Sequence, residues 1–192
     1  MEHLGKAYYV ALLSAAELHG AAHHRPQSFQ VMLAKNQRPI ACGEVRVQFV
    51  ARHDLARTPV VEKQSPRGRM LVSSPEATAL ELVGYADQCG GLDNVASVLA
   101  ELVETIDGLK LIEAARLCPI AWVQRLGYLL DLTEHRGLAD ALVDHVREHA
   151  AVLAPLVRAK PTARAQRVER WKLAINASVV DADIADLEEL RG

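Results

Sequence analysis

The sequence predicts an α/β fold of the α+β type, in which a small mixed, largely antiparallel sheet packs against a layer of helices. Strand-like alternation of apolar and polar residues precedes residue 87, and apolar residues recur at helical spacing after it, so the second half is expected to be mainly helical. Hydrophobic residues make up 50% of the chain, but aromatic residues only 4%. Such a core must be built from Leu, Val, Ile and Ala, which suits helices packed on a sheet.

With 192 residues, the chain is long enough to bury a sizeable core, as one domain or two small ones. We expect one compact domain made of three stretches. Residues 1–90 form the sheet-containing half, residues 91–157 the helical half, and residues 158–192 a basic segment, a final strand and an acidic tail.

The first element is expected to be a helix from Tyr8 to Ala22, because leucines and alanines recur there at helical spacing and Gly20 lies near its end. His19 and His23 are four residues apart, so a regular helix would bring both imidazoles to one face as metal ligands. Gly20 disturbs the helix between them, and no acidic third ligand lies nearby. A structural role for His19 is therefore preferred over metal binding.

Strands are expected next at residues 29–34 and 45–49, where apolar and polar residues alternate. Because the short polar turn at residues 35–39 joins them, these two strands are expected to pair antiparallel, with Phe29, Val31 and Leu33 directed toward the core. Residues 60–61 and 70–72 are expected to add strands around a second turn.

The stretch from residue 73 predicts the start of a helix in one of two ways. Ser73 and Glu76 have the S-x-x-E spacing of a capping box. Alternatively, Ser74 is the N-cap and Pro75 occupies the first helical position, where its missing N–H costs nothing. In both cases Glu76 lies in the first turn, where the helix dipole favours an anion.

The second half predicts a series of amphipathic helices. Residues 92–106, 109–118, 121–132 and 138–157 carry apolar side chains at the spacing of one helical face. In the tail, Trp171, Leu173 and Ile175 alternate with Lys172 and Ala174. This alternation predicts a last strand, which is expected to return to the sheet of the first half.

Three stretches resemble, in the right order, the antitoxin domain of the AbiEi family. They are YYVALLSAAELHGAAHHRPQSFQV from Tyr8, VSSPEATALEL from Val72 and GGLDNVASVLAEL from Gly90. The resemblance extends to about Leu130, with a weaker similarity at residues 170–176. It implies an antitoxin that counteracts a nucleotidyltransferase-like toxin, with His19 as a buried hydrogen-bonding group. None of the three stretches is a catalytic signature, so a non-catalytic binding role is expected.

Many AbiEi-family proteins also carry an N-terminal winged helix that binds their own promoter. Here only residues 1–7 precede the first matching stretch, so the resemblance covers the antitoxin domain without the winged helix. An alternative function, a DNA-binding regulator of its own operon, would then rest on basic patches. Such contacts would be salt-dependent and indifferent to sequence.

Basic residues form two groups that are candidates for contact with a protein partner or a nucleic acid. The 22 basic and 24 acidic residues nearly balance, which argues against a whole surface that binds nucleic acid but not against a local patch. Arginine side chains suit carboxylates and phosphates, although a charged run is most often a solvated face. The first group is Arg46, Arg52, Arg57, Arg67 and Arg69. The second group is Arg164, Arg167, Arg170 and Lys172.

One motif resembles an enzyme site. His145, Glu148 and His149 match the H-x-x-E-H pattern, in which two histidines on one helical face bind zinc and the glutamate activates water. A third ligand would come from one of the downstream residues Glu169, Glu188 and Glu189. The motif lies on the polar side of its helix in a chain with 8 histidines, so a chance match is preferred. No enzyme activity, metal or cofactor is therefore expected, and a zinc hydrolase is the least favoured alternative.

The cysteines and the apolar segments indicate the compartment. Cys42, Cys89 and Cys118 are widely spaced and form no C-x-x-C pair, which is typical of reduced thiols in the cytosol. The first residues lack the pattern of a signal peptide, and no segment approaches the roughly 20 apolar residues that span a bilayer. We therefore expect a cytoplasmic protein with no membrane partner.

Overall fold

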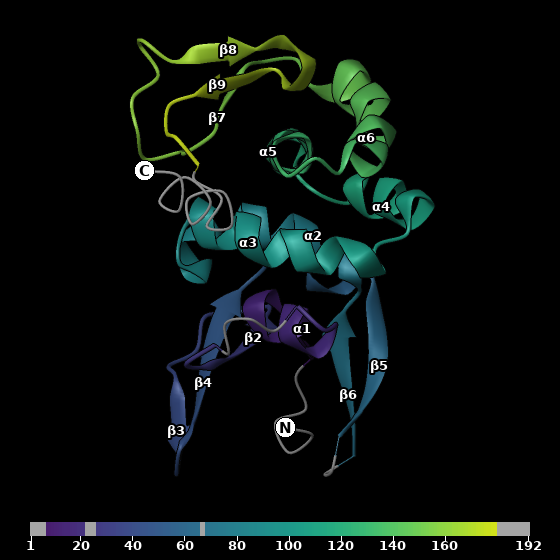
Figure 1. Cartoon of the computed structure of the whole chain (residues 1–192). Coiled ribbons are helices and arrows are strands. Elements are labelled where there is room, and N and C mark those ends of the chain that lie inside the picture. Colours follow the sequence, from purple (N-terminus) through teal and green to yellow (C-terminus); the bar gives the residue numbers. More distant parts are fainter. Residues whose placement is uncertain (1–6, 22–25, 66–67, 180–192) are drawn as a thin grey trace, which may run out of the picture.

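A computed structural model of the chain describes residues 7–21, 26–65 and 68–179. A six-stranded mixed sheet lies at one end, helices occupy the middle, and a three-stranded sheet lies at the other end (Figure 1). The predicted fold class is confirmed, including the mainly helical second half. The strands of the large sheet are β1 (Tyr8–Val10), β2 (Phe29–Leu33), β3 (Ile40–Cys42), β4 (Val45–Ala51), β5 (Val60–Ser65) and β6 (Gly68–Ser73).

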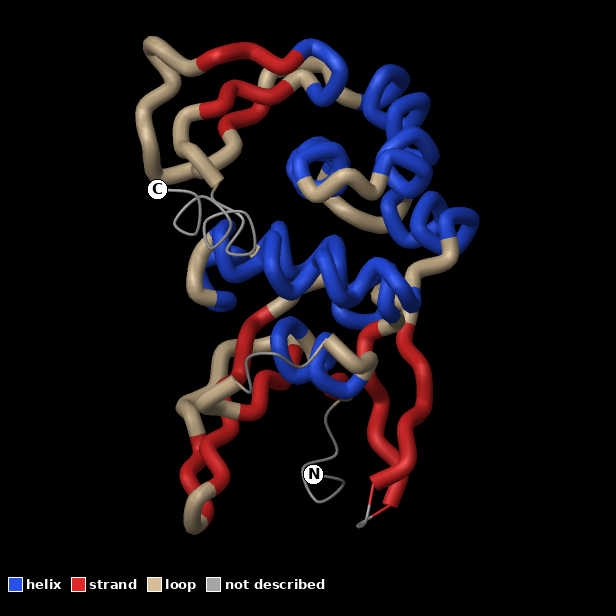
Figure 2. The backbone as a smooth tube through the Cα atoms, viewed as in Figure 1, coloured by secondary structure: helices blue, strands red, loops and turns tan. Residues whose placement is uncertain are grey.

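The large sheet has the strand order β3-β4-β2-β1-β6-β5. Its outer parts are the antiparallel hairpins β3–β4 and β5–β6, which extend away from the helices on either side of α1 (Leu12–Leu18), as Figure 2 shows. The strands predicted on either side of the turn at residues 65–68 are present, and the structure pairs them antiparallel.

The strands at residues 29–34 and 45–49 were predicted to pair antiparallel, and this direction was wrong. β2 and β4 run parallel, with Val31 opposite Phe49. The physical reason is the additional strand β3, which reverses at Gly43, where φ is 61°, and pairs antiparallel with β4. The chain therefore reverses twice between β2 and β4. Val31 and Leu33 pack with Phe49 in a small separate cluster, whereas Met32, from the opposite face of β2, reaches the main core.

The helix predicted from residue 8 begins later, at Leu12. Tyr8–Val10 is instead the central strand β1, antiparallel to β2 and parallel to β6. Hydrogen-bonded neighbours on both sides and the burial of Tyr9 and Val10 outweigh the helical spacing of the apolar residues. Leu12 has a φ of 55°, which marks the sharp change from strand to helix.

The remaining helices form the layer that covers the sheet and extends beyond it. They are α2 (Pro75–Gly84), α3 (Leu92–Leu102), α4 (Gly108–Ala115), α5 (Ile120–Leu132) and α6 (Arg136–His149). α2 lies at the centre and contacts α1, α3, α4 and α5. Within the described residues, no helix has the length and apolar character that crossing a bilayer requires.

Ser74, rather than Ser73, begins α2. Its Oγ accepts the N–H of Ala77 at 3.2 Å, and Pro75 occupies the first turn. The Oγ of Ser73 instead pairs with Thr78 Oγ1 at 2.7 Å. Glu76 accepts the backbone N–H of Asp107 at 3.1 Å, so it fastens α2 to the start of α4 and does not close a capping box. Of the two starts predicted, the second is confirmed.

The main core combines residues from all three stretches of the chain. Leucines from α2, α3, α5 and α6 meet Tyr9 of β1 and Trp171 of the tail in one cluster. The Trp171 ring packs against Gly127 of α5 so closely that a Cβ at residue 127 would lie 2.1 Å from it. Burial of this apolar surface is the main source of stability.

The prediction that the last strand returns to the large sheet was wrong. This strand is β9 (Leu173–Ile175), which pairs with β7 (Ala154–Pro155) and β8 (Gln166–Val168) in a second sheet. The open edges of the large sheet are β3 and β5, and the helical layer separates them from the tail (Figure 1). The helix predicted to reach residue 157 ends at His149, because the segment after it forms β7.

Candidate macromolecule-binding surface

Arg52, one of the predicted binding residues, lies in the interior. Its Nη1 donates to Glu81 Oε1 at 2.6 Å, and the two side chains are 7% and 0% exposed. The Tyr9 hydroxyl donates to the same oxygen at 2.6 Å, and Thr58 Oγ1 lies 3.0 Å from that hydroxyl. Because this network joins the end of β4 to α2, Arg52 is a structural residue and no part of a binding surface.

Burial governs the electrostatics of this network. It raises the pKa of Glu81 to about 7, since the carboxylate lies in the core and its Oε2 has no hydrogen-bond partner among the described residues. Burial, together with the nearby Glu81, also raises the pKa of Tyr9, so the phenol stays protonated and donates. The network therefore connects the sheet to α2 through hydrogen bonds between buried polar side chains.

The other arginines of the first group do not gather in one patch. Arg46 is exposed on β4, and Arg69 is exposed on β6, in the other hairpin (Figure 1). Arg69 also pairs with Glu62 across its own hairpin at 3.3 Å. Arg57 is exposed in a short 3₁₀ helix, and Arg67 lies outside the described residues. The large sheet thus separates these charges.

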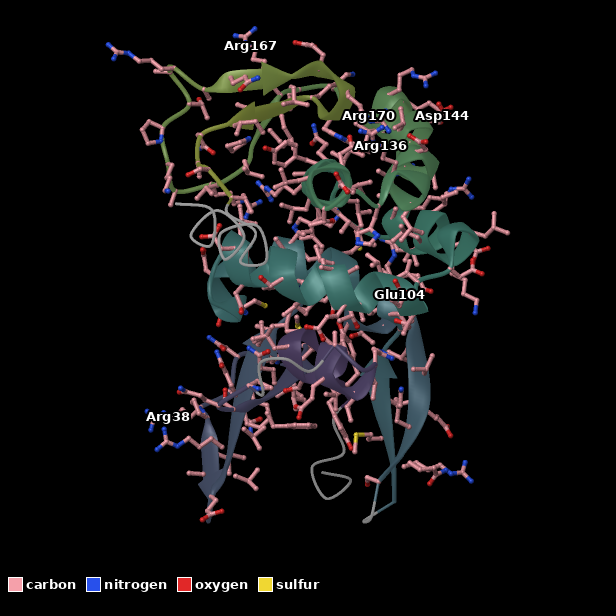
Figure 3. All side chains as sticks on the ribbon, in the orientation of Figure 1. Arg38, Glu104, Arg136, Asp144, Arg167 and Arg170 are labelled. Carbon is pink, nitrogen blue, oxygen red and sulfur yellow. The ribbon has the colours of Figure 1, made fainter. Side chains whose placement is uncertain are left out.

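Two of the four predicted tail cations are held by internal contacts. Arg170 pairs with Asp131 of α5 at 3.0 Å and also with Asp140 of α6, and its guanidinium lies over the Trp171 ring. Figure 3 shows Arg170 beside α6. Lys172 donates to the carbonyl of Ala150. Both residues fasten the small sheet to the helices and are poor candidates for partner contact.

Four exposed cations remain around the small sheet, and we call them the basic rim. They are Arg158, Lys160, Arg164 and Arg167. Arg167 projects from β8 away from the body of the molecule (Figure 3). Within the part of the chain that the structure describes, no carboxylate lies within ion-pair distance of these four residues. The basic rim is therefore the candidate surface for a partner that carries phosphates or carboxylates.

The H-x-x-E-H motif lies on the exposed side of α6. The rings of His145 and His149 stack with centroids 4.4 Å apart, and His149 Nδ1–H donates to the carbonyl of His145 at 3.0 Å. Glu148 is exposed. No group of three metal-ligating side chains occurs among the residues described, and Glu188 and Glu189 lie outside them. The geometry gives the zinc alternative no support.

Comparison with known proteins identifies the family. A family model described as the AbiEi antitoxin C-terminal domain matches residues 9–132, which is more than half of the chain. The chain belongs to the AbiEi antitoxin family. Membership implies an antitoxin role, and the matched residues hold the large sheet and α1 to α5.

One of two similar solved structures supports the fold of this AbiEi-family protein. The crystal structure of the RV2827C protein from Mycobacterium tuberculosis matches with a TM-score of 0.62 and 17% identity, and the match covers 100% of this chain and 68% of that one. An antigenic nucleotidyltransferase-like protein from Paracoccidioides brasiliensis matches with a TM-score of 0.43 and 13% identity, covering 73% of this chain and 86% of that one. No curated protein has a significant sequence match.

The polar residues of the family stretches serve the fold. His19 is half-buried, and its Nε2–H donates to the carbonyl of Ser73 at 2.7 Å, which joins α1 to the end of β6. Burial lowers the pKa of His19, so the neutral ring is favoured. His19 thus makes a hydrogen bond but is half-buried, whereas the resemblance implied a buried group; His23 lies outside the described residues.

Sequence reasoning missed three polar residues that hold the fold of this AbiEi-family protein. Glu81 and Arg125 are buried, and Glu81 pairs with Arg52. Asn176 is half-buried and follows β9. The only signal for Arg125 was a polar pair, Gln124 and Arg125, inside the otherwise apolar AWVQRLGYLL. Such a pair on a buried helix indicates polar partners from elsewhere in the chain.

Proposed function

We propose that this protein is an antitoxin that counteracts a nucleotidyltransferase-like toxin by a non-catalytic binding role. The observation that carries the proposal is the family match over residues 9–132. The polar groups inside the protein support it, because Arg52, Glu81 and His19 hold elements of the fold together. A binding surface is thus the feature through which the chain would act.

The basic rim is the surface that we assign to this role. The described residues provide no ion-pair partner for the exposed cations of the basic rim, so these cations lose no such pair on binding, whereas Arg170 would have to leave Asp131 and Asp140. Charges on such a surface mainly speed encounter and select the correct partner. The partner is then the toxin itself or a phosphate-rich target that the toxin also uses.

Co-expression with a nucleotidyltransferase-like toxin tests the proposal. The intact chain is expected to restore growth of cells that produce the toxin. The double variant Arg164→Gln and Arg167→Gln is expected to restore growth less well, because it removes half of the basic rim. The matched control, Arg46→Gln with Arg69→Gln, removes the same charge from the hairpins and is expected to protect fully. Soluble, folded protein that gives no protection would refute the antitoxin role.

The basic rim also favours a second candidate function, binding of nucleic acid. Contact through four cations depends steeply on salt, because phosphate neutralisation releases counterions. A gel shift with the DNA upstream of the gene distinguishes the two roles. DNA binding that weakens strongly with salt and does not depend on the DNA sequence would indicate contact through the basic rim only. Tight, sequence-specific binding at physiological salt would instead indicate a regulator of its own operon.

A further inference from the structure

A cavity of about 260 Å³ lies where α3, α5 and the segment after β7 meet. Three cations line it from α5 and from residues 156–160, namely Arg125, Arg158 and Lys160. Asp87 and Asp93 line it from the start of α3 and the turn before it. The cavity therefore has a basic side and an acidic side.

Arg125 is the unusual member of this set, because it is a buried guanidinium with no carboxylate partner among the residues that the structure describes. The side chain is 4% exposed, and its Nε and Nη2 both donate to the carbonyl of Pro155, at 3.1 and 3.0 Å. Among the described residues, Nη1 has no hydrogen-bond partner, yet it is not one of the fully enclosed unpaired atoms. Arg125 lines the cavity, and Nη1 is the one guanidinium nitrogen for which the described residues provide no acceptor.

Among the described residues, no carboxylate lies within ion-pair distance of Arg125. Burial, with a further contribution from nearby Arg158, lowers the pKa of Arg125. A buried charge without a counter-ion destabilises a protein strongly, unless a ligand supplies the opposite charge. An anion in this partly open cavity would lie near two guanidinium groups and an ammonium group.

The segment that carries Arg158 and Lys160 is held in place beside the cavity. Asn176 accepts the N–H of Val157 at 2.9 Å and donates to the carbonyls of Val157 and Lys160, both at 2.8 Å. Leu156 N–H also donates to Ala174 at 3.0 Å. Because the backbone is fixed on both sides of Arg158, binding an anion there would cost little ordering entropy.

We propose that this cavity is a binding site for a phosphate group, held by Arg125, Arg158 and Lys160. The two carboxylates occupy the α3 side, so the phosphate belongs on the basic side, against Arg125. The cavity has room for a phosphate and part of the molecule that bears it, and the source is free phosphate or the phosphate of a small nucleotide. The proposal goes beyond the antitoxin role and does not depend on it.

Binding to the full chain tests the site, with inorganic phosphate and adenosine monophosphate as the probes at constant ionic strength. Titration calorimetry is expected to show saturable phosphate binding, accompanied by a rise in Tm. The exposed pair Arg158→Gln and Lys160→Gln is expected to weaken binding at least about tenfold. Arg164→Gln with Arg167→Gln makes the same charge change outside the cavity and is expected to bind as tightly as the original chain.

The outcomes distinguish free phosphate from a nucleotide as the ligand, and binding in the cavity from an effect of overall charge. Tighter binding of adenosine monophosphate assigns the site to nucleotides, and equal affinity assigns it to free phosphate; both support the site. Arg125→Met, if it folds, is expected to abolish saturable binding. Absence of saturable binding to the original chain would overturn the proposal. Equal weakening in the two double variants would also overturn it, because the effect would then come from overall charge.

Discussion

At the scale of single residues, the decisive feature is the carboxylate of Glu81 in the core. It accepts from Arg52 and Tyr9 through one oxygen, while the other oxygen has no partner among the described residues. Burial opposes ionisation and the neighbouring guanidinium favours it, and burial dominates because the group has no solvent contact. The side chain therefore couples the stability of the protein to pH.

The first prediction concerns this coupling. The pKa of Glu81 is about 7 in the folded protein against 4.5 without the fold, so the folded state keeps a proton that the unfolded chain releases. The free energy of unfolding is therefore expected to fall as pH rises from 4.5 to 7, by about 3 kcal/mol from this group. Glu81→Gln removes this contribution. Urea unfolding of both proteins across this window measures it, because other titrating groups cancel in the difference.

The opposite sign would contradict this interpretation. If the original protein gained stability relative to Glu81→Gln with rising pH, the pair with Arg52 would outweigh burial. A difference that is constant with pH would mean that Glu81 ionises equally in both states.

At the scale of elements, two close contacts determine how the helices are placed. Ser74 sets the first residue of α2, and Gly127 lets the Trp171 ring approach α5. The first contact is local in sequence, and the second joins residues far apart in the chain. Each gives a prediction about stability.

The cap of α2 rests on one hydroxyl. Ser74→Ala is expected to lower the free energy of unfolding by about 1 kcal/mol, because the N–H of Ala77 loses its acceptor at a buried helix end. Ser97→Ala, at a half-exposed position within α3, is the control and is expected to change stability by less than about 0.5 kcal/mol. Chemical denaturation measures both. Equal effects would mean that Ser74 does not cap the helix.

Gly127 is expected to behave unlike an ordinary helical glycine. Glycine-to-alanine changes within helices usually stabilise by up to about 1 kcal/mol. Here the new Cβ would lie 2.1 Å from the Trp171 ring, so Gly127→Ala is expected to destabilise by about 1–3 kcal/mol. Gly137→Ala in α6 meets no atom within 4 Å and is the matched control, expected to be neutral or stabilising. A stabilising Gly127→Ala would show that Trp171 is not packed there.

At the scale of the whole molecule, the two sheets lie at opposite ends of the helical layer (Figure 2). Most residues of α2 and α5 are buried, whereas the outer parts of the β3–β4 and β5–β6 hairpins are largely exposed. Surfaces at the two ends are therefore available to partners independently, while the helices between them hold the fold together.

This arrangement predicts unequal local stability. Hydrogen–deuterium exchange is expected to be slowest in α2 and α5 and faster by orders of magnitude near Ile40 and Arg69, because few apolar contacts protect those hairpin ends. Peptide-level mass spectrometry measures the difference. Hairpin ends as slow to exchange as α5 would mean that the hairpins are covered, for example by association of the chain with itself.

What could be predicted from the sequence was local or compositional. Spacings within a few residues predicted the mixed fold class and the start of α2. They also predicted the strands on either side of residues 65–68 and the helices of the second half. The exposure of Arg164 and Arg167 also follows from their polar surroundings. These features are determined by the sequence because the interactions that set them lie within a turn or two of the chain.

Only the tertiary structure decided the rest, because those features depend on partners far apart in the sequence. Tyr8–Val10 became a strand through neighbours on both sides, and the tail formed its own sheet against α5. Arg52 is buried against Glu81, 29 residues away, and Arg170 stays exposed but pairs with Asp131 and Asp140. The charge pattern is the same for a solvated arginine and a buried one, and only packing distinguishes them.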